Sequence, residues 1–240
     1  MDKIRCYEGL GGEGCRVPVD QRYTALLVAD NPDKAGAFHA NTDALASRLV
    51  EQLGFEQVNG LYHQYSLAEG QSPTSVRKVF DTQGTVASEI GNVRDAFISG
   101  AAWNTMYVSY EGHGSKHLLG SYSEQFIKAE DAANLDNSRY PVFAALTCVA
   151  GDDTYPGVRS LAGSLVLNPT GGGIAAMAPT GPSLDRDAHL LGGAFVEGLF
   201  LGRDTVGTAL GSAKQQTDGE IQSFMPEIYS IIGDPAIYPR

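Results

Sequence analysis

The sequence has little positive charge, few cysteines and no long apolar run. Its 240 residues include 17 Lys and Arg against 28 Asp and Glu, which gives a formal net charge of −11. Nucleic acids and anionic membrane surfaces both bind basic faces, so this balance argues against either as a partner. No apolar stretch approaches the roughly 20 residues that a membrane-spanning helix requires.

Several motifs of common enzyme classes are also missing. The chain has no G-x-x-x-x-G-K-[ST] loop and no G-x-S-x-G motif, which excludes a P-loop and the serine elbow of an α/β-hydrolase. Residues 9–14 match G-x-G-x-x-G formally, but no strand precedes them and no helix follows, so we reject a nucleotide site there. Residues 1–6 lack the apolar core of a signal peptide. Two expectations stay open: a cytoplasmic protein, or a piece of a longer precursor.

The three cysteines are Cys6, Cys15 and Cys148, an odd number that leaves at least one thiol unpaired. Cys6 and Cys15 share a glycine-rich segment in which they could form a disulfide. Cys148 stands alone at the end of an apolar run, where the ordinary interpretation is a small buried hydrophobic residue.

Apolar runs alternate with helical patterns from residue 23 onward. Runs that are apolar on both faces are typical of a parallel sheet covered on both sides. We predict strands at 23–29, 57–65, 105–110, 141–147, 173–178 and 228–232, and helices at 42–53, 86–99, 158–167, 188–201 and 203–217. Residues 66–85 are predicted to be a long loop. The pattern indicates one α/β domain over 23–240 after an irregular lead-in over 1–22.

Two residues suited to catalysis follow the ends of predicted strands. His113 comes after the 105–110 strand and Cys148 after the 141–147 strand, 35 residues apart. Sites in α/β sheets lie at the carboxyl ends of the strands, so neighbouring strands would bring both side chains to one rim. A cysteine nucleophile needs an imidazole nearby, and backbone N–H groups to hold the oxyanion. Gly112 and Gly114 leave the backbone open, so the amides of Gly114 and Cys148 are the expected donors.

Simpler interpretations compete with this one. Taken singly, His113 is more often a turn histidine and Cys148 a core cysteine, and only their combination favours catalysis. His113 and His117 also have the i, i+4 spacing of zinc ligands. The glutamate of H-E-x-x-H is absent and a turn is expected here, so we predict no metal site.

Several segments resemble a known family in the same order along the chain. Residues 110–115, Y-E-G-H-G-S, resemble the Y-x-G-H-G-S segment of the gingipain-like cysteine peptidases, the C25 family of the caspase-like clan. Residues 145–151 resemble the nucleophile segment of that family. Further similar segments are 27–30, 160–162, 168–173 and 232–236, so that the resemblance covers about residues 23–238.

The resemblance implies a caspase-like three-layer α/β sandwich with a mostly parallel sheet. It implies a cysteine endopeptidase with polypeptide substrates, in which Cys148 is the nucleophile and His113 the general acid and base. No cofactor is implied as required. Family members can bind calcium, but this sequence has no D-x-[DN]-x-[DN]-G loop and no ion can be placed. The resemblance implies a secreted or cell-envelope location, although residues 1–6 lack the apolar core of a signal peptide.

The resemblance also implies a preference for arginine or lysine at P1, with an acidic residue in the pocket. The nearest candidates are Asp152 and Asp153 after the nucleophile, and Asp185 and Asp187 after the fifth strand. Asp185 and Asp187 precede a predicted helix, so we favour a capping role for them. Two other functions stay open: a non-catalytic caspase-fold scaffold or subunit of a secretion or effector assembly, and a hydrolase that uses the same dyad on a non-peptide acyl substrate.

Overall fold

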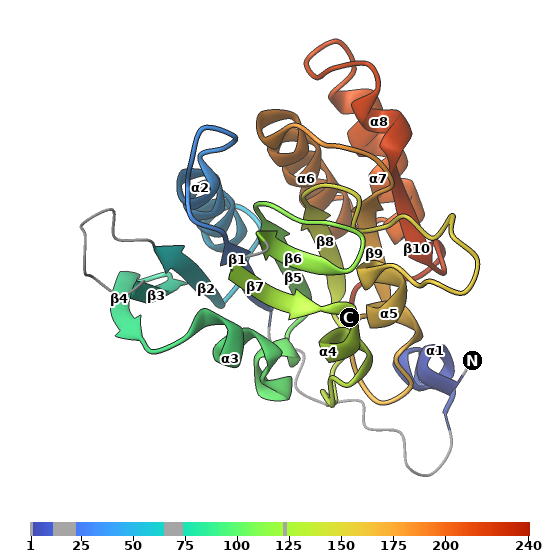
Figure 1. The fold of residues 1–240 in the computed structure, drawn as a ribbon, viewed down its shortest axis with the longest axis horizontal. Helices are drawn as coiled ribbons and strands as arrows, with labels where there is room; N and C mark the ends of the chain where they lie inside the picture. Colours follow the sequence, from blue (N-terminus) through green and yellow to red (C-terminus); the bar gives the residue numbers. More distant parts are fainter. Residues whose placement is uncertain (1, 12–22, 65–73, 122–123) are drawn as a thin grey trace.

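One eight-stranded sheet forms the centre of the computed structural model, which describes residues 2–11, 23–64, 74–121 and 124–240 (Figure 1). The strand order is β10-β9-β8-β5-β1-β2-β3-β4. The bounds are β1 Thr24–Ala29, β2 Gln57–Gln64, β3 Thr74–Asp81, β4 Gly84–Ile90, β5 Tyr107–Glu111, β8 Val142–Leu146, β9 Ala175–Pro179 and β10 Tyr229–Gly233. Strands β2, β1, β5, β8 and β9 run parallel, and β3, β4 and β10 extend the two edges in antiparallel pairs.

Helices cover both faces of the sheet. On one face lie α2 Phe38–Glu51, α6 Asp185–Phe200 and α7 Val206–Gln216. On the other lie α3 Val93–Ile98, the 3-10 helix Gly100–Trp103, α4 Ala129–Ala133 and α5 Leu161–Leu167, with the hairpin of β6 Leu118–Ser121 and β7 Glu124–Lys128. The predicted three-layer arrangement with a mostly parallel sheet is confirmed.

The central strands are apolar throughout because both of their faces are buried. In β1, Ala25, Leu27 and Ala29 pack with the α2–α6–α7 layer, whereas Leu26 and Val28 pack with the opposite layer. Side chains alternate between the faces of a strand, so a strand covered on both sides needs a continuous apolar run.

The edge beyond β2 differs from the prediction. Residues 74–90 form the β3–β4 hairpin, where we predicted a loop followed by a helix that begins at residue 86. Most of β4 is exposed, so its residues carry no period-2 apolar pattern. The second half of the predicted helix is present: Asn92 caps α3 by accepting the N–H of Arg94, and Val93 and Phe97 are buried one turn apart.

The first residues are more ordered than the predicted irregular lead-in, since Asp2–Tyr7 form helix α1. The Lys3 ammonium donates to carbonyl oxygens at the end of α5 and the loop after it: Leu165, Val166, Asn168 and Gly171. Burial lowers the pKa of Lys3 to about 7. Cys6 forms a disulfide, and Cys15 lies outside the described residues.

The remaining helix, α8 Met225–Ile228, leads into β10. Within the described residues, no helix is long and apolar enough to cross a membrane.

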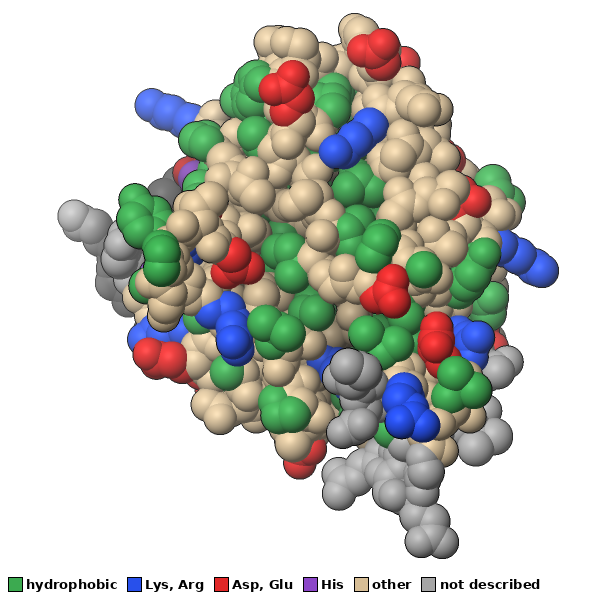
Figure 2. Space-filling model, turned by 90° about the vertical axis from the view of Figure 1, so that its right-hand side faces the viewer, with side chains coloured by type: hydrophobic (Ala, Val, Ile, Leu, Met, Phe, Trp, Pro, Cys, Tyr) green, Lys and Arg blue, Asp and Glu red, His purple; other side chains and the backbone are tan. Residues whose placement is uncertain are grey.

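The face that carries α1 and β10 shows acidic and basic side chains interspersed (Figure 2).

Candidate active site

The two predicted catalytic residues lie on one rim of the sheet. β5 and β8 are parallel neighbours, and their last register pair is Glu111 with Leu146. His113 and Cys148 therefore each lie two residues beyond that pair. The N–H of Gly112 donates to the carbonyl of Leu146 at 3.3 Å and joins the two strand ends. No hydrogen bond links the side chains of His113 and Cys148 in the part of the chain that the structure describes.

The turn that carries His113 is fixed by Asp30, a buried residue at the end of β1. Its Oδ2 accepts the His113 N–H at 3.2 Å and the Tyr110 hydroxyl at 3.3 Å. A side chain at Gly112 would clash with Asp30 and Tyr110, so only glycine fits. Burial raises the pKa of Asp30, while N–H bonds from Asn31 and His113 oppose the rise.

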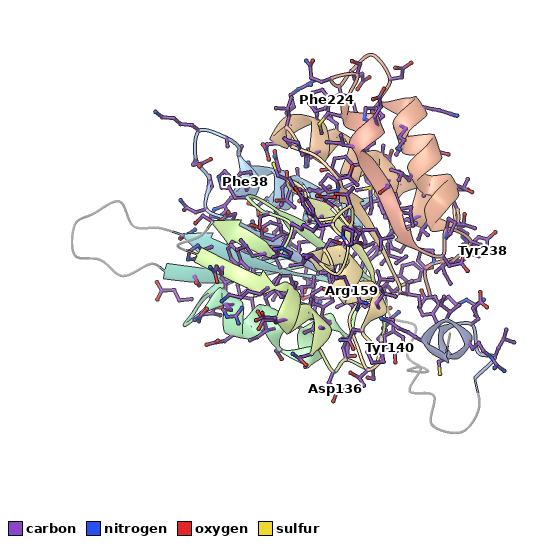
Figure 3. The ribbon with its side chains drawn as sticks, turned by 45° about the vertical axis from the view of Figure 1, so that its right-hand side comes forward. Phe38, Asp136, Tyr140, Arg159, Phe224 and Tyr238 are labelled. Carbon is purple, nitrogen blue, oxygen red and sulfur yellow. The ribbon has the colours of Figure 1, made fainter. Side chains whose placement is uncertain are left out.

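The imidazole of His113 has a carboxylate partner that the sequence analysis missed. Its Nε2 lies 3.0 Å from Oδ2 of Asp33, in the loop after β1. The ring also packs edge-on against Phe38, with centroids 5.4 Å apart. Figure 3 shows Phe38 at the start of α2, in the upper part of the view with Phe224 and away from Tyr140 and Asp136. The position of Asp33 is a signal that could have identified it, because it is a carboxylate just after β1, the strand that neighbours β5.

Asp33 is expected to orient the imidazole and to stabilise its protonated form. Its partial burial raises the pKa of its carboxyl, but hydrogen bonds from His113 and from the amides of Ala35 and Gly36 outweigh this, and the net pKa lies below the usual value. A depressed carboxyl pKa means that the pairing persists above the ordinary pKa of aspartate and is lost as the pH falls through the lower, folded-state value.

For the peptide hydrolysis that the sequence predicts, replacing Asp33 by asparagine is therefore expected to lower kcat/KM by up to about 100-fold. The substitution keeps the size of the side chain and removes the charge that holds the imidazolium. Asp43→Asn is the matched control, because Asp43 pairs with Lys78 and Tyr62 rather than with His113. Equal kcat/KM values for the Asp33 variant and the parent protein would contradict the assigned role.

Cys148 is half-buried and is a free thiol. Its Sγ accepts the N–H of Ser183 at 3.3 Å and lies 3.6 Å from the Ser183 carbonyl oxygen. The next residue, Val149, has φ +59°, a left-handed conformation that is strained for a β-branched side chain. The chain thus turns sharply directly after the candidate nucleophile.

Two amides near Cys148 are available to a substrate. Among the described residues, the N–H groups of Gly114 and Cys148 have no hydrogen-bond acceptor. The flanking bonds, Ser115 N–H to Leu118 and Gly120 N–H to His113, leave Gly114 unpaired between them. These are the two amides predicted to hold an oxyanion, and an unpaired N–H at a strand end can take that role.

A methyl group at Gly114 is expected to disturb this arrangement. Its Cβ would clash with the side chain of Thr147, so Gly114→Ala must displace the turn. We expect kcat to fall by roughly 100- to 1,000-fold, the usual cost of losing one oxyanion donor. Kinetics with a peptide substrate would measure this, and a melting curve would show that the fold persists. A fully active Gly114→Ala protein would exclude this amide from the oxyanion site.

The two acidic residues after the nucleophile have structural partners. Asp152 Oδ1 accepts the N–H and hydroxyl of Thr154, and its Oδ2 lies 3.8 Å from the Lys116 ammonium. The hydrogen bonds from Thr154 are the main cause of the lowered pKa of Asp152. Asp153 accepts the N–H of Ser160 and so fixes the loop before α5.

The capping role that we favoured for Asp185 and Asp187 is wrong. Helix α6 begins at Asp185, its N-cap is Leu184, and no side chain of the described residues caps it. Both carboxylates instead bind neighbouring segments. Asp185 Oδ2 accepts the N–H of Ala37 at 3.2 Å and the amide of Asn41 at 3.0 Å. Asp187 is buried and accepts the N–H of Gln222 at 2.9 Å.

A buried carboxylate lies directly behind the rim. Glu111 is 2% exposed, accepts the Asn41 amide at 2.7 Å and lies 3.5 Å from Nδ1 of His189. Burial raises the pKa of Glu111, and the bonds from His189 and Asn41 oppose the rise. The same contact, aided by Asp185, raises the pKa of His189 against the effect of burial. This cluster could not be predicted from the sequence, in which Glu111 stands out only as part of the Y-E-G-H-G-S segment.

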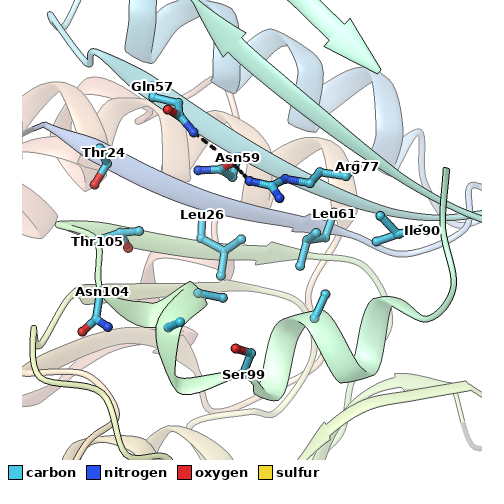
Figure 4. A pocket seen from close by; sticks show the side chains of 13 residues that line it. Thr24, Leu26, Gln57, Asn59, Leu61, Arg77, Ile90, Ser99, Asn104 and Thr105 are labelled. Atoms are coloured by element: carbon cyan, nitrogen blue, oxygen red, sulfur yellow. Dashed lines mark hydrogen bonds between the residues drawn. The ribbon is translucent and has the colours of Figure 1, made fainter. Parts of the chain in front are cut away.

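A cavity of about 490 Å³ lies elsewhere on the molecule (Figure 4). It is lined by the first residues of β1 and β2, Thr24 and Gln57, and by Thr105 just before β5. This is the amino end of the parallel strands, opposite the rim that carries His113 and Cys148. Within the described residues, no group of three His, Cys, Asp or Glu side chains is arranged to hold a metal ion.

Comparison of the sequence with models of known protein families identifies one family. The family model described as peptidase family C25 matches residues 1–240. The chain belongs to peptidase family C25. The resemblance of the sequence to the gingipain-like peptidases is thereby confirmed. None of the curated proteins compared with this chain is a match.

Solved structures agree with this C25 assignment at the level of the fold. The Arg-specific cysteine proteinase gingipain R superposes with a TM-score of 0.67 at 17% identity, over 90% of this chain and 47% of its own. The complex of Porphyromonas gingivalis RgpB pro- and mature domains gives 0.66 at 19% identity, over 90% and 48%. A secreted C11 cysteine protease from Bacteroides thetaiotaomicron gives 0.51 at 10% identity, over 88% and 66%. The C25 chain therefore has the predicted caspase-like fold and spans about half the length of the gingipain chains.

Proposed function

We propose that this chain is a cysteine endopeptidase that acts through Cys148 and His113. The observation that carries the proposal is their placement on adjacent parallel strand ends, beside two amides without acceptors. A thiol, an imidazole and an oxyanion site on one rim are the parts that acyl transfer requires. Membership of family C25 supports peptide bonds as the substrate.

The reaction follows from these positions. The Cys148 thiolate attacks the scissile carbonyl carbon, and the oxyanion accepts hydrogen bonds from the amides of Gly114 and Cys148. The His113 imidazolium, oriented by Asp33, protonates the leaving amine, which leaves a thioester on Cys148. His113 then removes a proton from water, which attacks the thioester and releases the acid and the thiolate.

Digestion of a substrate protein that has been reduced and carboxymethylated tests the proposal. The purified chain is expected to cleave internal peptide bonds of that substrate, and mass spectrometry would identify the cleavage sites. Prior alkylation of Cys148 should abolish cleavage, and a zinc chelator should leave it unchanged. Cleavage that survives alkylation of Cys148, or is lost with the chelator, would contradict the mechanism.

We further propose a preference for a basic residue at P1. The net charge of −11 and the name of gingipain R, an Arg-specific proteinase, support it. Asp185 is the best placed of the four candidate acids. It binds the loop that carries Asp33, and it lies two residues after Ser183, which contacts Cys148. Among the residues that the structure describes, the buried Oδ1 of Asp185 has no hydrogen-bond partner, and neither has the buried Oε2 of the nearby Glu111.

Asp185→Asn is expected to reduce kcat/KM for arginine or lysine substrates by more than about 10-fold, with little change for leucine substrates. A carboxylate pairs with a guanidinium through two charge-assisted bonds, which an amide cannot reproduce. Asp152→Asn is the control, since that carboxylate is held by Thr154. An unchanged Arg-to-Leu ratio in the Asp185 variant would exclude it as the pocket acid, and a parent protein that prefers Asp or apolar P1 would exclude basic specificity.

A further inference from the structure

The loop after β9, residues 180–184, lies against the candidate nucleophile. The N–H of Val149 donates to the carbonyl of Gly181 at 3.1 Å, and the N–H of Ser183 donates to Sγ of Cys148 at 3.3 Å. These two bonds bring the strained residue after the nucleophile and the sulfur itself into contact with one short loop. That loop has no regular secondary structure, so its position must come from other contacts.

Tyr229 supplies such a contact. It is the first residue of β10, is 0% exposed, and its hydroxyl lies 3.0 Å from Oγ of Ser183. The same hydroxyl lies 3.5 Å from the carbonyl oxygen of Thr147, the residue before the nucleophile. Burial raises the pKa of Tyr229, so the phenol stays neutral and keeps its proton for donation. One buried hydroxyl thus contacts both the residue before Cys148 and the loop that contacts its sulfur.

We propose that Tyr229 is a positioning residue. Its hydroxyl holds Ser183 in place, so that the backbone N–H of Ser183 points at the Cys148 sulfur. An N–H directed at a thiolate forms a charge-assisted hydrogen bond, which is stronger than the bond to a neutral thiol. The neutral thiol can instead donate to the Ser183 carbonyl at 3.6 Å. Ser183 therefore offers its N–H to the thiolate and its carbonyl oxygen to the neutral thiol. The Tyr229 hydroxyl fixes the position of Ser183 and so of both groups.

The consequence for catalysis rests on the proposed peptidase function, but the consequence for thiol reactivity does not. The thiolate is the reactive form of cysteine, so at a pH where a thiol is mostly protonated a weakened N–H contact should lower the thiolate fraction and slow reaction at Cys148. Alkylation by iodoacetamide at fixed pH, read at Cys148 by peptide mapping, therefore tests the inference without requiring peptidase activity.

Tyr229→Phe is expected to slow alkylation of Cys148 by roughly 3- to 10-fold, the range for loss of one hydrogen bond. If peptidase activity is present, kcat should fall by a similar factor with KM unchanged. Tyr62→Phe is the matched control. Tyr62 is equally buried, and its hydroxyl donates at 2.6 Å to Asp43, whose other partner is Lys78 and not a residue in contact with Cys148. It should lower the melting temperature without changing the reactivity of Cys148.

Ser183→Ala removes the other partner of the same hydrogen bond, and it serves alone if the Tyr229 variant does not fold. It should slow alkylation to a similar extent, and the double variant should be no slower than either single one. Alkylation rates equal to that of Tyr62→Phe, faster alkylation, or effects that multiply in the double variant would each overturn the inference. A parent protein that hydrolyses no peptide, but whose alkylation slows as described, would contradict the proposed function and leave the role of Tyr229 standing.

Discussion

Replacing Cys148 by alanine is expected to lower the rate of peptide hydrolysis by more than about 1,000-fold, because no other group in the mechanism forms the acyl intermediate. The remaining rate would come from substrate binding and from the two amides, which the substitution does not remove. The fold should survive, since Cys148 is half-buried and alanine leaves only a small space beside Ser183.

Cys148→Ser separates the chemistry from the packing at this position. A hydroxyl is close in size to a thiol, but it ionises far less readily and is a weaker nucleophile beside the same histidine. We therefore expect the serine variant to be as inactive as the alanine variant, with the melting temperature of the parent protein. Activity that persists in either variant would show that another thiol or another group is the nucleophile.

Replacing His113 by alanine is expected to lower kcat/KM by roughly 100- to 10,000-fold, the range for loss of a general acid and base. The loss of the ring also removes its edge-on contact with Phe38, so a modest decrease in melting temperature is expected with the loss of activity. Kinetics with a peptide amide substrate measures the effect on the step in which the leaving amine is protonated.

His117→Ala is the matched control, since His117 is exposed in the same loop, four residues further along. This variant should retain the activity of the parent protein. A loss that is equal in both variants and is reversed by added zinc would favour the metal site that the i, i+4 spacing first suggested. A loss confined to His113→Ala supports the dyad.

The central part of the fold could be predicted from the sequence because burial on both faces dictates apolar strands. The runs that became β1, β5, β8 and β9 were predicted within about two residues of their bounds. The β3–β4 hairpin could not be predicted in this way. It lies at the sheet edge, where exposed positions such as Val86 and Ser88 carry no apolar alternation.

The site was predicted where chemistry and strand position coincide, as at His113 and Cys148. Partners that come from other elements were missed. Asp33 reaches His113 from the loop after β1, and Asn41 reaches Glu111 from α2. These contacts depend on how the β1–α2 connection lies over β5, which a local pattern does not encode. For the same reason the sequence pattern predicts a helix cap at Asp185, whereas its partners in the structure are Ala37 and Asn41.

Labelling by peptidyl acyloxymethyl ketones tests the central claim, that Cys148 is the nucleophile of a peptidase, most directly. Compounds with Arg, Lys, Asp or an apolar residue at P1 would each be incubated with the parent protein and with Cys148→Ala, followed by intact-mass and peptide-mapping mass spectrometry. We predict one adduct, on Cys148, formed fastest with the Arg or Lys compound and absent from the variant. No adduct with any compound, or an adduct on a different residue, would contradict the claim.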